Sequence, residues 1–354
     1  MIAQHILSYA QTLAGGGVER ALLRMAGGWI AAGRRVTLVV GSRAGPLAAE
    51  LPEGLEIVDL GDPRQAALLR ALPGIVRKLR PDVIFCAGNH YSGIAAWTRM
   101  RLGRGCPPIV AKVSNALVRR DMGAAVALGY RRWLRLHPNF LDAVVAMTPA
   151  SAKEARAAMP GVDVHVIANP PAQPVEGAEP VVLPAERYLL GVGRLAPQKR
   201  WERLIAALPK LADRSIALVI LGEGGQRNIL EALVAALGLQ DRVSLPGHAA
   251  DPLPAIAGAA VVALTSDFEG VPGVLREAAS VGTPVVATES SVAVREIVAP
   301  DGGTVVPVGD EAALVAALDD WLGGRPRPAP VIAGGDPVAD YLALFDSLAS
   351  SASS

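Results

Sequence analysis

The sequence has few aromatic residues and no long apolar segment, and each shortage excludes a class of protein. Phe, Trp and Tyr make up 4% of the 354 residues although 51% are hydrophobic, so the interior must be built from Ala, Val, Leu and Ile. Such interiors are typical of buried parallel strands covered by helices. No apolar run reaches the roughly 18 residues that span a bilayer, and the longest, 255–264, contains Gly258. We therefore expect no membrane-spanning segment.

Cysteine and histidine are also scarce. The two cysteines and five histidines follow no metal-binding spacing, so we expect no metal site. Cys86 ends an apolar run and is interpreted as a core residue. Little cysteine favours a reducing compartment, and the N-terminus lacks the features of a signal peptide, so we expect a cytoplasmic protein. The net charge of +1 gives no global field for nucleic acid, and only a local basic patch could supply one.

Short apolar runs alternate with helical patterns along the chain, which indicates a doubly wound α/β fold. Residues 18–32 carry an inward apolar stripe and predict a helix. The expected strands are 5–10, 35–40, 82–86, 108–113, 143–146 and 164–167 in the first half, and 188–192, 216–221, 243–245, 260–264, 285–287 and 303–306 in the second. The expected helices of the second half are 201–211, 227–237, 273–281, 311–322 and 337–348.

A proline-rich stretch divides the chain. Five prolines fall between residues 170 and 184, and because proline removes an amide donor, the stretch is interpreted as an interdomain linker. We expect one domain over 1–169, a second over 185–335, and a C-terminal helix and tail over 336–354 that packs back on the first domain. Ligands of open α/β sheets bind beyond the carboxyl ends of the strands, so both domains could face one ligand across a cleft.

The first candidate site follows a predicted strand and reads Gly191-Val-Gly-Arg-Leu-Ala-Pro-Gln-Lys199. Its glycines let a ligand approach the backbone, and Arg194 and Lys199 could both reach a diphosphate there. The alternative is that both cations are solvated loop charges. The spacing Gly191-x-Gly193-x-x-Ala196 also fits a dinucleotide fingerprint, but Arg194 would crowd that loop, so a nicotinamide site is the second interpretation.

The second candidate site is the stretch from Glu269 to Glu277, Glu-Gly-Val-Pro-Gly-Val-Leu-Arg-Glu. Pro272 suits the first helical position, so the amides of Gly273 and Val274 would form an anion site at a helix N-terminus. Glu277 would lie about one turn inside the helix and could contact a different part of the ligand from Glu269. The alternative is that Glu269 caps the helix and Glu277 is a surface residue.

These motifs resemble the family 4 glycosyltransferases, a large retaining group with the GT-B fold of two Rossmann-like domains facing a central cleft. The resemblance covers nearly the whole chain, and its most specific motif is the pair of glutamates with seven residues between them. The motifs stand in the family's order: Gly16-Gly17-Val-Glu19, Gly193-Arg194-Leu-x-x-x-Lys199, Gly222-Glu-Gly224, Glu269 to Glu277, Thr283-Pro284-Val-Val-Ala and Arg295-Glu296-Ile-Val.

The resemblance implies roles for particular residues. Arg194 and Lys199 would hold the diphosphate of a nucleotide-sugar donor, and Glu269 would address the transferred sugar as the third catalytic residue. Glu277 would bind the ribose hydroxyls. The rest of the donor site would be lined by Gly16, Gly17, Gly193, Gly247, His248, Gly270, Val271, Gly273 and Val274. Among these, Gly247 and His248 would frame the base.

The resemblance further implies a retaining transfer of sugar from a nucleoside-diphosphate donor, taken as UDP-linked, to a saccharide or lipid-linked acceptor in cell-envelope or exopolysaccharide synthesis. Paired cations and helix amides would stabilise the leaving group, so neither metal nor cofactor is expected. Many members have a histidine where this chain has Asn115, and His90 could serve instead on the acceptor side. The alternatives are a GT-B epimerase or phosphorylase, or a non-catalytic sugar-nucleotide-binding subunit.

Five arginines gather between residues 117 and 137. Arginines beside aromatic residues on a helix suit an anionic membrane surface, so a peripheral contact with the inner face of the plasma membrane is one hypothesis. The alternative is an ordinary amphipathic helix whose Tyr130, Trp133 and Leu134 pack on the sheet. The arginines are Arg119, Arg120, Arg131, Arg132 and Arg135.

Overall fold

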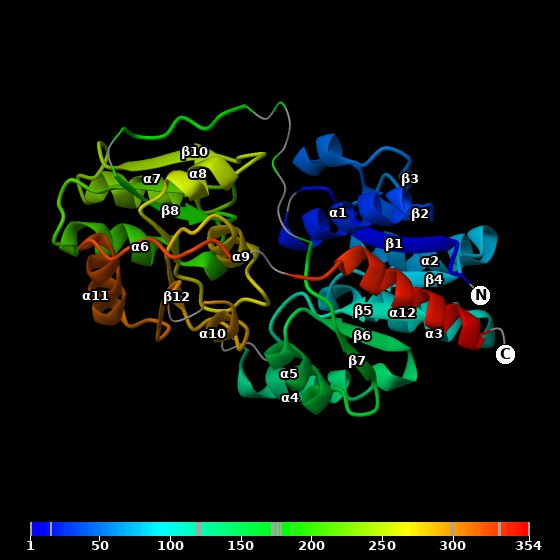
Figure 1. The fold of residues 1–354 in the computed structure, drawn as a ribbon. Helices are drawn as coiled ribbons and strands as arrows, with labels where there is room; N and C mark the ends of the chain where they lie inside the picture. The colour runs from blue at the N-terminus through cyan, green and yellow to red at the C-terminus, as the bar shows by residue number, and fades with distance from the viewer. Residues whose placement is uncertain are drawn as a thin grey trace. The chain divides into compact units, whose positions relative to one another are not determined.

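The chain forms two compact units, each with helices on both faces of a parallel sheet (Figure 1). The first unit contains residues 1–170 and 335–354, and the second contains residues 171–334. The α/β fold class predicted from the sequence is confirmed. The structure is a computed structural model, and it describes residues 2–352 except 15, 118–121, 171–173, 175–176, 178, 186, 299–300 and 332–333.

The first unit is built on a seven-stranded sheet of order β3-β2-β1-β4-β5-β6-β7. The strands are β1 (His5–Thr12), β2 (Arg35–Ser42), β3 (Glu56–Asp59), β4 (Val83–Cys86), β5 (Ile109–Lys112), β6 (Ala143–Ala146) and β7 (Asp163–Val166). The edge strand β3 was not predicted, because its two apolar residues are flanked by exposed acids and give no periodicity. The helices are α1 (Gly17–Ala31), α2 (Gln65–Leu79), α3 (Ser92–Leu102), α4 (Ala124–Leu134), α5 (Pro149–Ala158) and α12 (Pro337–Ala352).

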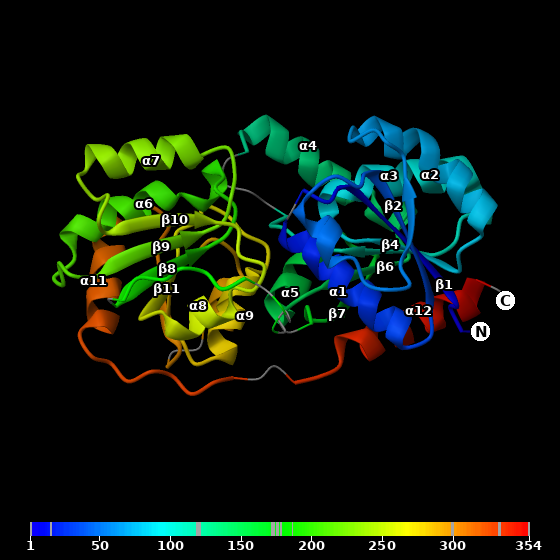
Figure 2. The ribbon, with the colours of Figure 1, turned by 90° about the horizontal axis from the view of Figure 1, so that it is seen from above.

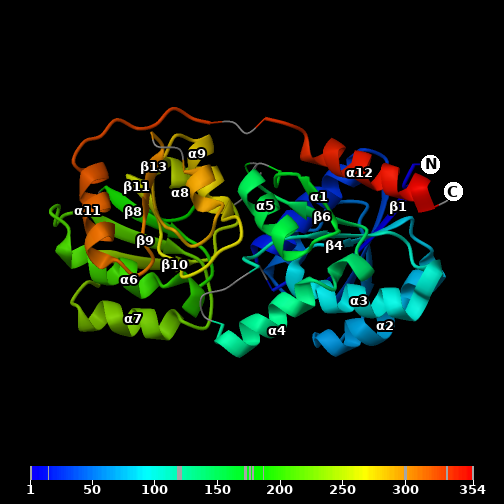
Figure 3. The ribbon, with the colours of Figure 1, turned by 90° about the horizontal axis from the view of Figure 1, so that it is seen from below.

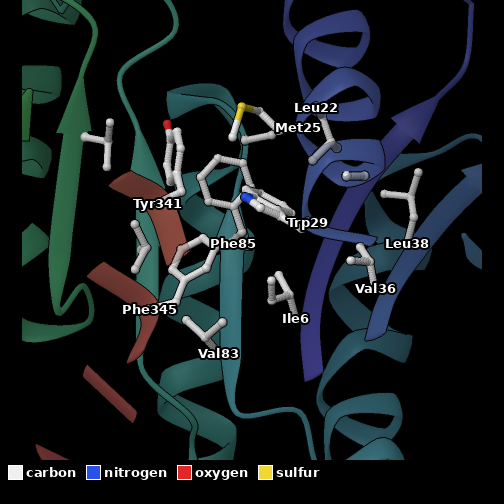
Figure 4. Close-up of a cluster of buried hydrophobic side chains, with 14 of the residues drawn as sticks. Ile6, Leu22, Met25, Trp29, Val36, Leu38, Val83, Phe85, Tyr341 and Phe345 are labelled. Atoms are coloured by element: carbon white, nitrogen blue, oxygen red, sulfur yellow. The ribbon is translucent and has the colours of Figure 1, made fainter. Parts of the chain in front are cut away.

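The C-terminal helix α12 packs beside α1 on one face of this sheet (Figures 1 and 4). Trp29 of α1 lies edge-on to Phe85 of β4 and to Phe345 of α12, with ring centroids 5.3 and 5.2 Å apart. Asp346 accepts hydrogen bonds from the Ala3 amide at 2.8 Å and from Arg34 at 2.9 Å. Aromatic packing and these polar contacts therefore make α12 part of the first unit.

The opposite face of the same sheet is covered by α2, α3 and α4 (Figure 3). Leu68, Ile94 and Leu134 supply one buried residue from each of these helices. Helix α2 leads across the sheet from β3 to β4, whereas α3 and α4 connect neighbouring strands. Right-handed crossovers place these connections on one face, where α5 also packs. Cys86 is buried in this core as predicted, and burial raises the pKa of its thiol to about 11.

The second unit has a six-stranded sheet of order β10-β9-β8-β11-β12-β13. The strands are β8 (Tyr188–Val192), β9 (Ala217–Leu221), β10 (Val243–Gly247), β11 (Val261–Leu264), β12 (Val285–Thr288) and β13 (Gly303–Val306). One face is covered by α6, α7 and α11, and the other by α8, α9 and α10 (Figure 2). These helices are α6 (Trp201–Ala207), α7 (Arg227–Ala236), α8 (Leu253–Gly258), α9 (Gly273–Ser280), α10 (Val294–Ile297) and α11 (Glu311–Leu322).

Strand order reverses at one point in each sheet, between β1 and β4 in the first unit and between β8 and β11 in the second. Loops leaving the carboxyl ends of two such strands turn to opposite faces, which opens the crevice where open α/β sheets bind ligands. The two candidate motifs of the second unit follow β8 and β11 directly. None of the helices among the described residues is long and apolar enough to cross a membrane.

Candidate active site

The loop after β8 is held by Trp201, the first residue of α6. Its side chain is 1% exposed, and its indole Nε1 donates a hydrogen bond to the backbone oxygen of Arg194 at 3.0 Å. The ring lies so close to Gly191 that a Cβ atom there would come within 2.7 Å of it. Gly191 is therefore required for the packing of α6, and the motif's second glycine, Gly193, lies nearer the cations.

The loop after β9 passes directly against the loop after β8, which accounts for the motif Gly222-Glu-Gly224. A Cβ atom on Gly222 would lie 2.0 Å from the backbone oxygen of Gly193, and one on Gly224 would lie 2.4 Å from that of Leu195. The Leu195 amide donates to the Glu223 carbonyl at 2.9 Å. Any larger residue at either glycine would push the two loops apart.

Lys199 and Glu269 meet at the switch point between β8 and β11. The Lys199 Nζ lies 2.7 Å from the Glu269 Oε1, and the Ser266 hydroxyl donates to the same oxygen at 2.6 Å. The side chains of Lys199 and Glu269 are only 17% and 10% exposed, and burial strengthens such a pair. The motifs placed both residues at one ligand, but neither their mutual contact nor the part of Ser266 was predicted.

The loop that carries Glu269 is fixed by the loop after β12. The Glu269 amide donates to the Ser290 carbonyl at 2.9 Å, and the Ser291 hydroxyl donates to the Gly270 carbonyl at 2.7 Å. Gly270 and the following Val271 are half-buried. Because its backbone is bound on one side and its carboxylate on the other, Glu269 has little freedom to turn away, and it does not cap α9.

Asp267 stands two residues before Glu269 but points to different partners. Its carboxylate binds Arg200 Nε at 2.5 Å and Arg203 Nη2 at 2.7 Å. The two acids therefore do not act as a pair. Within the part of the chain that the structure describes, no three His, Cys, Asp or Glu side chains are grouped so that they could hold a metal ion.

Arg194 differs from Lys199 in being exposed. Its backbone is anchored by Trp201, but its guanidinium forms no hydrogen bond or ion pair with any residue that the structure describes. The β8 loop therefore presents one cation already bound to a carboxylate and one that is available to an anion.

Helix α9 begins at Gly273, so Pro272 is its N-cap and not its first helical residue as expected, and the cap makes no side-chain hydrogen bond. Gly273 is exposed and Val274 is buried beneath it. Glu277 is half-buried, and its Oε1 lies 3.9 Å from where a Cβ atom of Gly273 would stand, so the carboxylate lies over the first turn. The amides at the start of α9 and the Glu277 carboxylate thus occupy one small region.

Gly247 ends β10 in a left-handed conformation with φ of 98°. Its carbonyl accepts a hydrogen bond from the Gly222 amide at 2.7 Å, which links the loops after β9 and β10. His248 is exposed beside them. The pKa of Glu223 is lowered, first by its hydrogen bonds from Arg227 and in smaller part by His248. These residues lie at the same sheet edge as the β8 loop.

In the first unit, α1 begins at Gly17 with Gly16 as its N-cap. Glu19 folds over this end of the helix, since its Oε2 would lie 2.6 Å from a Cβ atom on Gly16. The Tyr91 hydroxyl donates to the Glu19 Oε1 at 3.2 Å and accepts from the Gln11 amide at 2.9 Å. Burial raises the pKa of Tyr91, so it keeps this proton. The loops after β1 and β4 are thereby joined at the first switch point.

His90 and Asn115 lie on the neighbouring loops after β4 and β5. His90 is exposed, with its ring centroid 3.8 Å from that of Tyr91. The Asn115 side-chain oxygen accepts from the next amide, that of Ala116, at 2.8 Å. The loops are linked by Asn89, whose Oδ1 accepts from the Asn115 amide at 3.1 Å. Asn89 was not predicted, because its role depends on contact between loops far apart in sequence.

Two doubly wound units in one chain, each with its polar residues at a switch point, define a GT-B fold. Residues 179–334 match the family described as Glycosyl transferases group 1, and residues 15–172 match Glycosyltransferase Family 4. The chain belongs to these glycosyltransferases, and the family assignment made by resemblance is confirmed.

Individual glycosyltransferases are also similar to this chain in sequence or in fold. One relative is the N-acetylgalactosamine-N,N'-diacetylbacillosaminyl-diphospho-undecaprenol 4-alpha-N-acetylgalactosaminyltransferase of Campylobacter jejuni. The two sequences are 34% identical over 138 residues, and these residues make up 39% of this chain and 38% of that enzyme. The chain is 26% identical to the 2-deoxystreptamine N-acetyl-D-glucosaminyltransferase of Streptomyces fradiae over 94% of this chain and 85% of that enzyme. Among solved structures, HepE of Anabaena in complex with UDP and glucose shares the fold, with a TM-score of 0.71, 20% identity, and coverage of 99% of this chain and 97% of HepE.

Proposed function

We propose that this glycosyltransferase is retaining and metal-independent, and that it takes its sugar from a nucleoside-diphosphate donor. The observation that carries the proposal is the group of Arg194, Lys199 and Glu269 near the N-terminus of α9, all at one switch point. Cations and helix amides together favour a diphosphate. A rigidly held carboxylate beside them suits a sugar hydroxyl or a developing positive charge.

In the proposed reaction, the bond between the anomeric carbon and the β-phosphate oxygen breaks while the acceptor's hydroxyl oxygen bonds to the same face of that carbon. The departing phosphate oxygen takes the acceptor's proton, so the products are a glycoside and a nucleoside diphosphate. Arg194 and the α9 amides would stabilise the charge that grows on the diphosphate. Glu269 would stabilise the cationic character of the sugar. A divalent ion has no necessary task in this scheme.

The contact between Lys199 and Glu269 gives Lys199 two tasks in the proposal. Its ammonium group has three donors, and one is used by the Glu269 Oε1. The remaining donors could reach the diphosphate while the first holds the carboxylate in place. Lys199 would then couple the leaving group to the group that faces the sugar, which a solvated loop lysine could not do.

The remaining donor residues complete the proposal. Glu277 would bind the ribose hydroxyls, and the backbone at Gly247 and His248 would frame the base. We propose UDP as the nucleotide, supported by the UDP bound to HepE, which shares the fold. We propose a saccharide or lipid-linked acceptor in cell-envelope polysaccharide synthesis. The name of the Campylobacter relative, which includes a diphospho-undecaprenol, supports this proposal. Gly16, Gly17, His90 and Asn115 would face the phosphates and the acceptor from the first unit.

We also propose a peripheral contact with an anionic membrane through α4. Arg131, Arg132 and Arg135 are exposed, while Arg119 and Arg120 lie outside the described residues. Leu134 is buried, and Tyr130 and Trp133 are half-buried against the core, as the alternative interpretation expected. The arginines, rather than these rings, would therefore make the contact.

A thermal-shift screen with UDP, GDP, ADP and their sugars tests the donor. Binding stabilises the folded state by mass action, by about 2.7 kcal/mol when the ligand is at 100 times its dissociation constant. For units of this size that is a rise in Tm of about 5–10 °C. The nucleotide sugar that gives the largest rise is then incubated alone, and slow hydrolysis to the nucleoside diphosphate is expected. If no nucleotide raises Tm, the proposal is wrong; binding without hydrolysis or transfer would indicate a non-catalytic subunit.

A further inference from the structure

Positive charge is concentrated in one part of this nearly neutral chain. From Asp62 to Asp142 the sequence contains fourteen arginines or lysines and four aspartates, a formal charge of +10, whereas the whole chain carries +1. This segment supplies α2, α3 and α4, which cover the same face of the first sheet (Figure 3). The described cations that α2, α3 and α4 carry therefore gather on one side of one unit.

Eight cations on this face have no acidic partner. None of them forms an ion pair with a residue that the structure describes, and all are exposed. By contrast, Arg99 of α3, which lies closer to the sheet, is bound to Asp142. The eight residues are Arg77, Lys78, Arg80, Arg101, Arg104, Arg131, Arg132 and Arg135.

The same face exposes large apolar side chains. On α3, Met100 is 66% exposed and Trp97 is 37% exposed, with the Arg101 guanidinium 5.5 Å from the centroid of the Trp97 ring. On and after α4, the exposed apolar residues are Val126, Leu128 and Leu136. Cations set beside exposed apolar groups are the composition of a surface that lies at a membrane interface.

The three helices form one continuous surface. Arg77 of α2 donates to the backbone oxygen of Arg101 at 2.9 Å, and the Trp133 Nε1 of α4 donates to the Ser92 hydroxyl of α3 at 3.2 Å. Helix α3 thus lies between α2 and α4 and is tied to both. Its tryptophan and methionine are flanked by the cations of its neighbours.

We propose that the face formed by α2, α3 and α4 is a docking surface for an anionic lipid bilayer, and that Trp97 and Met100 enter the interfacial layer. This deepens the proposed contact of α4 and rests on the proposed lipid-linked acceptor. A soluble polyanion would satisfy the cations but would leave Met100, Leu128 and Leu136 in water. A bilayer satisfies both, because its headgroups bind the cations and its interface takes up the tryptophan ring.

The test uses the full chain and vesicles of phosphatidylcholine, with or without an equal part of phosphatidylglycerol. We expect sedimentation with the anionic vesicles only, weakened by salt. Of the five tryptophans, Trp29, Trp201 and Trp321 are buried and Trp133 is half-buried, so Trp97 should give most of the change in emission. Emission should shift to the blue and be quenched by brominated lipid, and Trp97→Phe should remove both effects.

Charge variants locate the surface. Lys78→Gln, Arg101→Gln and Arg104→Gln together should lower the vesicle partition coefficient about a hundredfold, since each cation near an anionic surface contributes about fivefold. The matched control is Arg325→Gln, because Arg325 also stacks on a tryptophan, Trp321, but lies in the second unit. The control should bind vesicles like the wild type, and the triple variant should keep its Tm.

Three results would overturn this inference: no binding to anionic vesicles at low salt, binding without any change in Trp97 emission, or binding to heparin with no vesicle binding. Donor hydrolysis in the same preparations separates this inference from the proposed function. Hydrolysis without vesicle binding refutes only the docking surface. Vesicle binding without stabilisation by any nucleotide refutes only the donor assignment.

Discussion

Breaking the pair of Lys199 and Glu269 should cost far more stability than breaking an exposed pair of the same chemistry. Among the residues that the structure describes, Lys199→Met leaves the Glu269 carboxylate with only the Ser266 hydroxyl as a donor, and the Glu269 side chain is 10% exposed. The control is Lys210→Met, which breaks the contact of Lys210 with Glu311, whose side chains are 52% and 49% exposed. Both changes replace a lysine by an uncharged residue of similar length.

The expected magnitudes follow from burial. Removing one partner of a fully buried pair costs about 3–5 kcal/mol, because the other charge is left without compensation. The 17% exposure of Lys199 leaves some access to water, so we expect about 2–3 kcal/mol. That corresponds to a fall in Tm of about 5–10 °C. The Lys210→Met variant should lose less than about 1 kcal/mol.

A double-mutant cycle checks the reasoning. Lys199→Met combined with Glu269→Gln removes both charges and keeps an acceptor for Ser266, so the double variant should regain most of the lost stability. Thermal or urea unfolding of the single and double variants measures the coupling free energy. The comparison depends on the difference in burial between the two pairs. If the Tm values of Lys199→Met and Lys210→Met agree within 1 °C, the pair of Lys199 and Glu269 does not stabilise the fold as its burial implies. Loss of donor hydrolysis is expected in both Lys199→Met and the double variant.

Three further predictions address the proposed donor site. Arg194→Ala should lower the rate of donor hydrolysis by about 10²–10³-fold with Tm unchanged, since the side chain is exposed; wild-type rates would exclude Arg194 from the site. Glu277→Ala should weaken UDP binding, measured by calorimetry, by about 10–100-fold, because hydrogen bonds to a charged group contribute about that much. Equal affinity of the wild type and the variant for UDP would refute the ribose assignment. EDTA should leave activity unchanged, so complete loss that manganese restores would contradict the metal-independent mechanism.

The sequence was sufficient where a motif and its strand lie next to each other in the chain. The loops after β8 and β11 could be placed at one sheet edge because strand ends of a parallel sheet share that edge. What could not be predicted depends on contacts between loops distant in sequence, such as the hydrogen bond from Ser266 to Glu269 or the bridging by Asn89. The polar pair Thr265 and Ser266 directly after a buried strand was the only signal for the former.

The glycine motifs show a related limit, because sequence spacing does not separate glycines that face a ligand from glycines that allow packing. Gly191 is required by the ring of Trp201, and Gly222 by the carbonyl of Gly193. Helix ends show it too. The helix expected over 201–211 ends at Ala207 and continues as a 3₁₀ turn. The proline in this turn has no amide to donate.

The net charge of the whole chain does not show how charge is distributed over its surface, and that distribution is what a binding partner meets. Fields between exposed charges fall off within about 8 Å at physiological ionic strength, so a partner responds to the charges on one face and not to a sum of +1. On the α2–α4 face eight cations lack acidic partners among the described residues, whereas at the donor site Lys199 is already compensated by Glu269. Salt should therefore weaken vesicle binding much more than it weakens donor binding, because the compensated pair is shielded from water and the exposed cations are not.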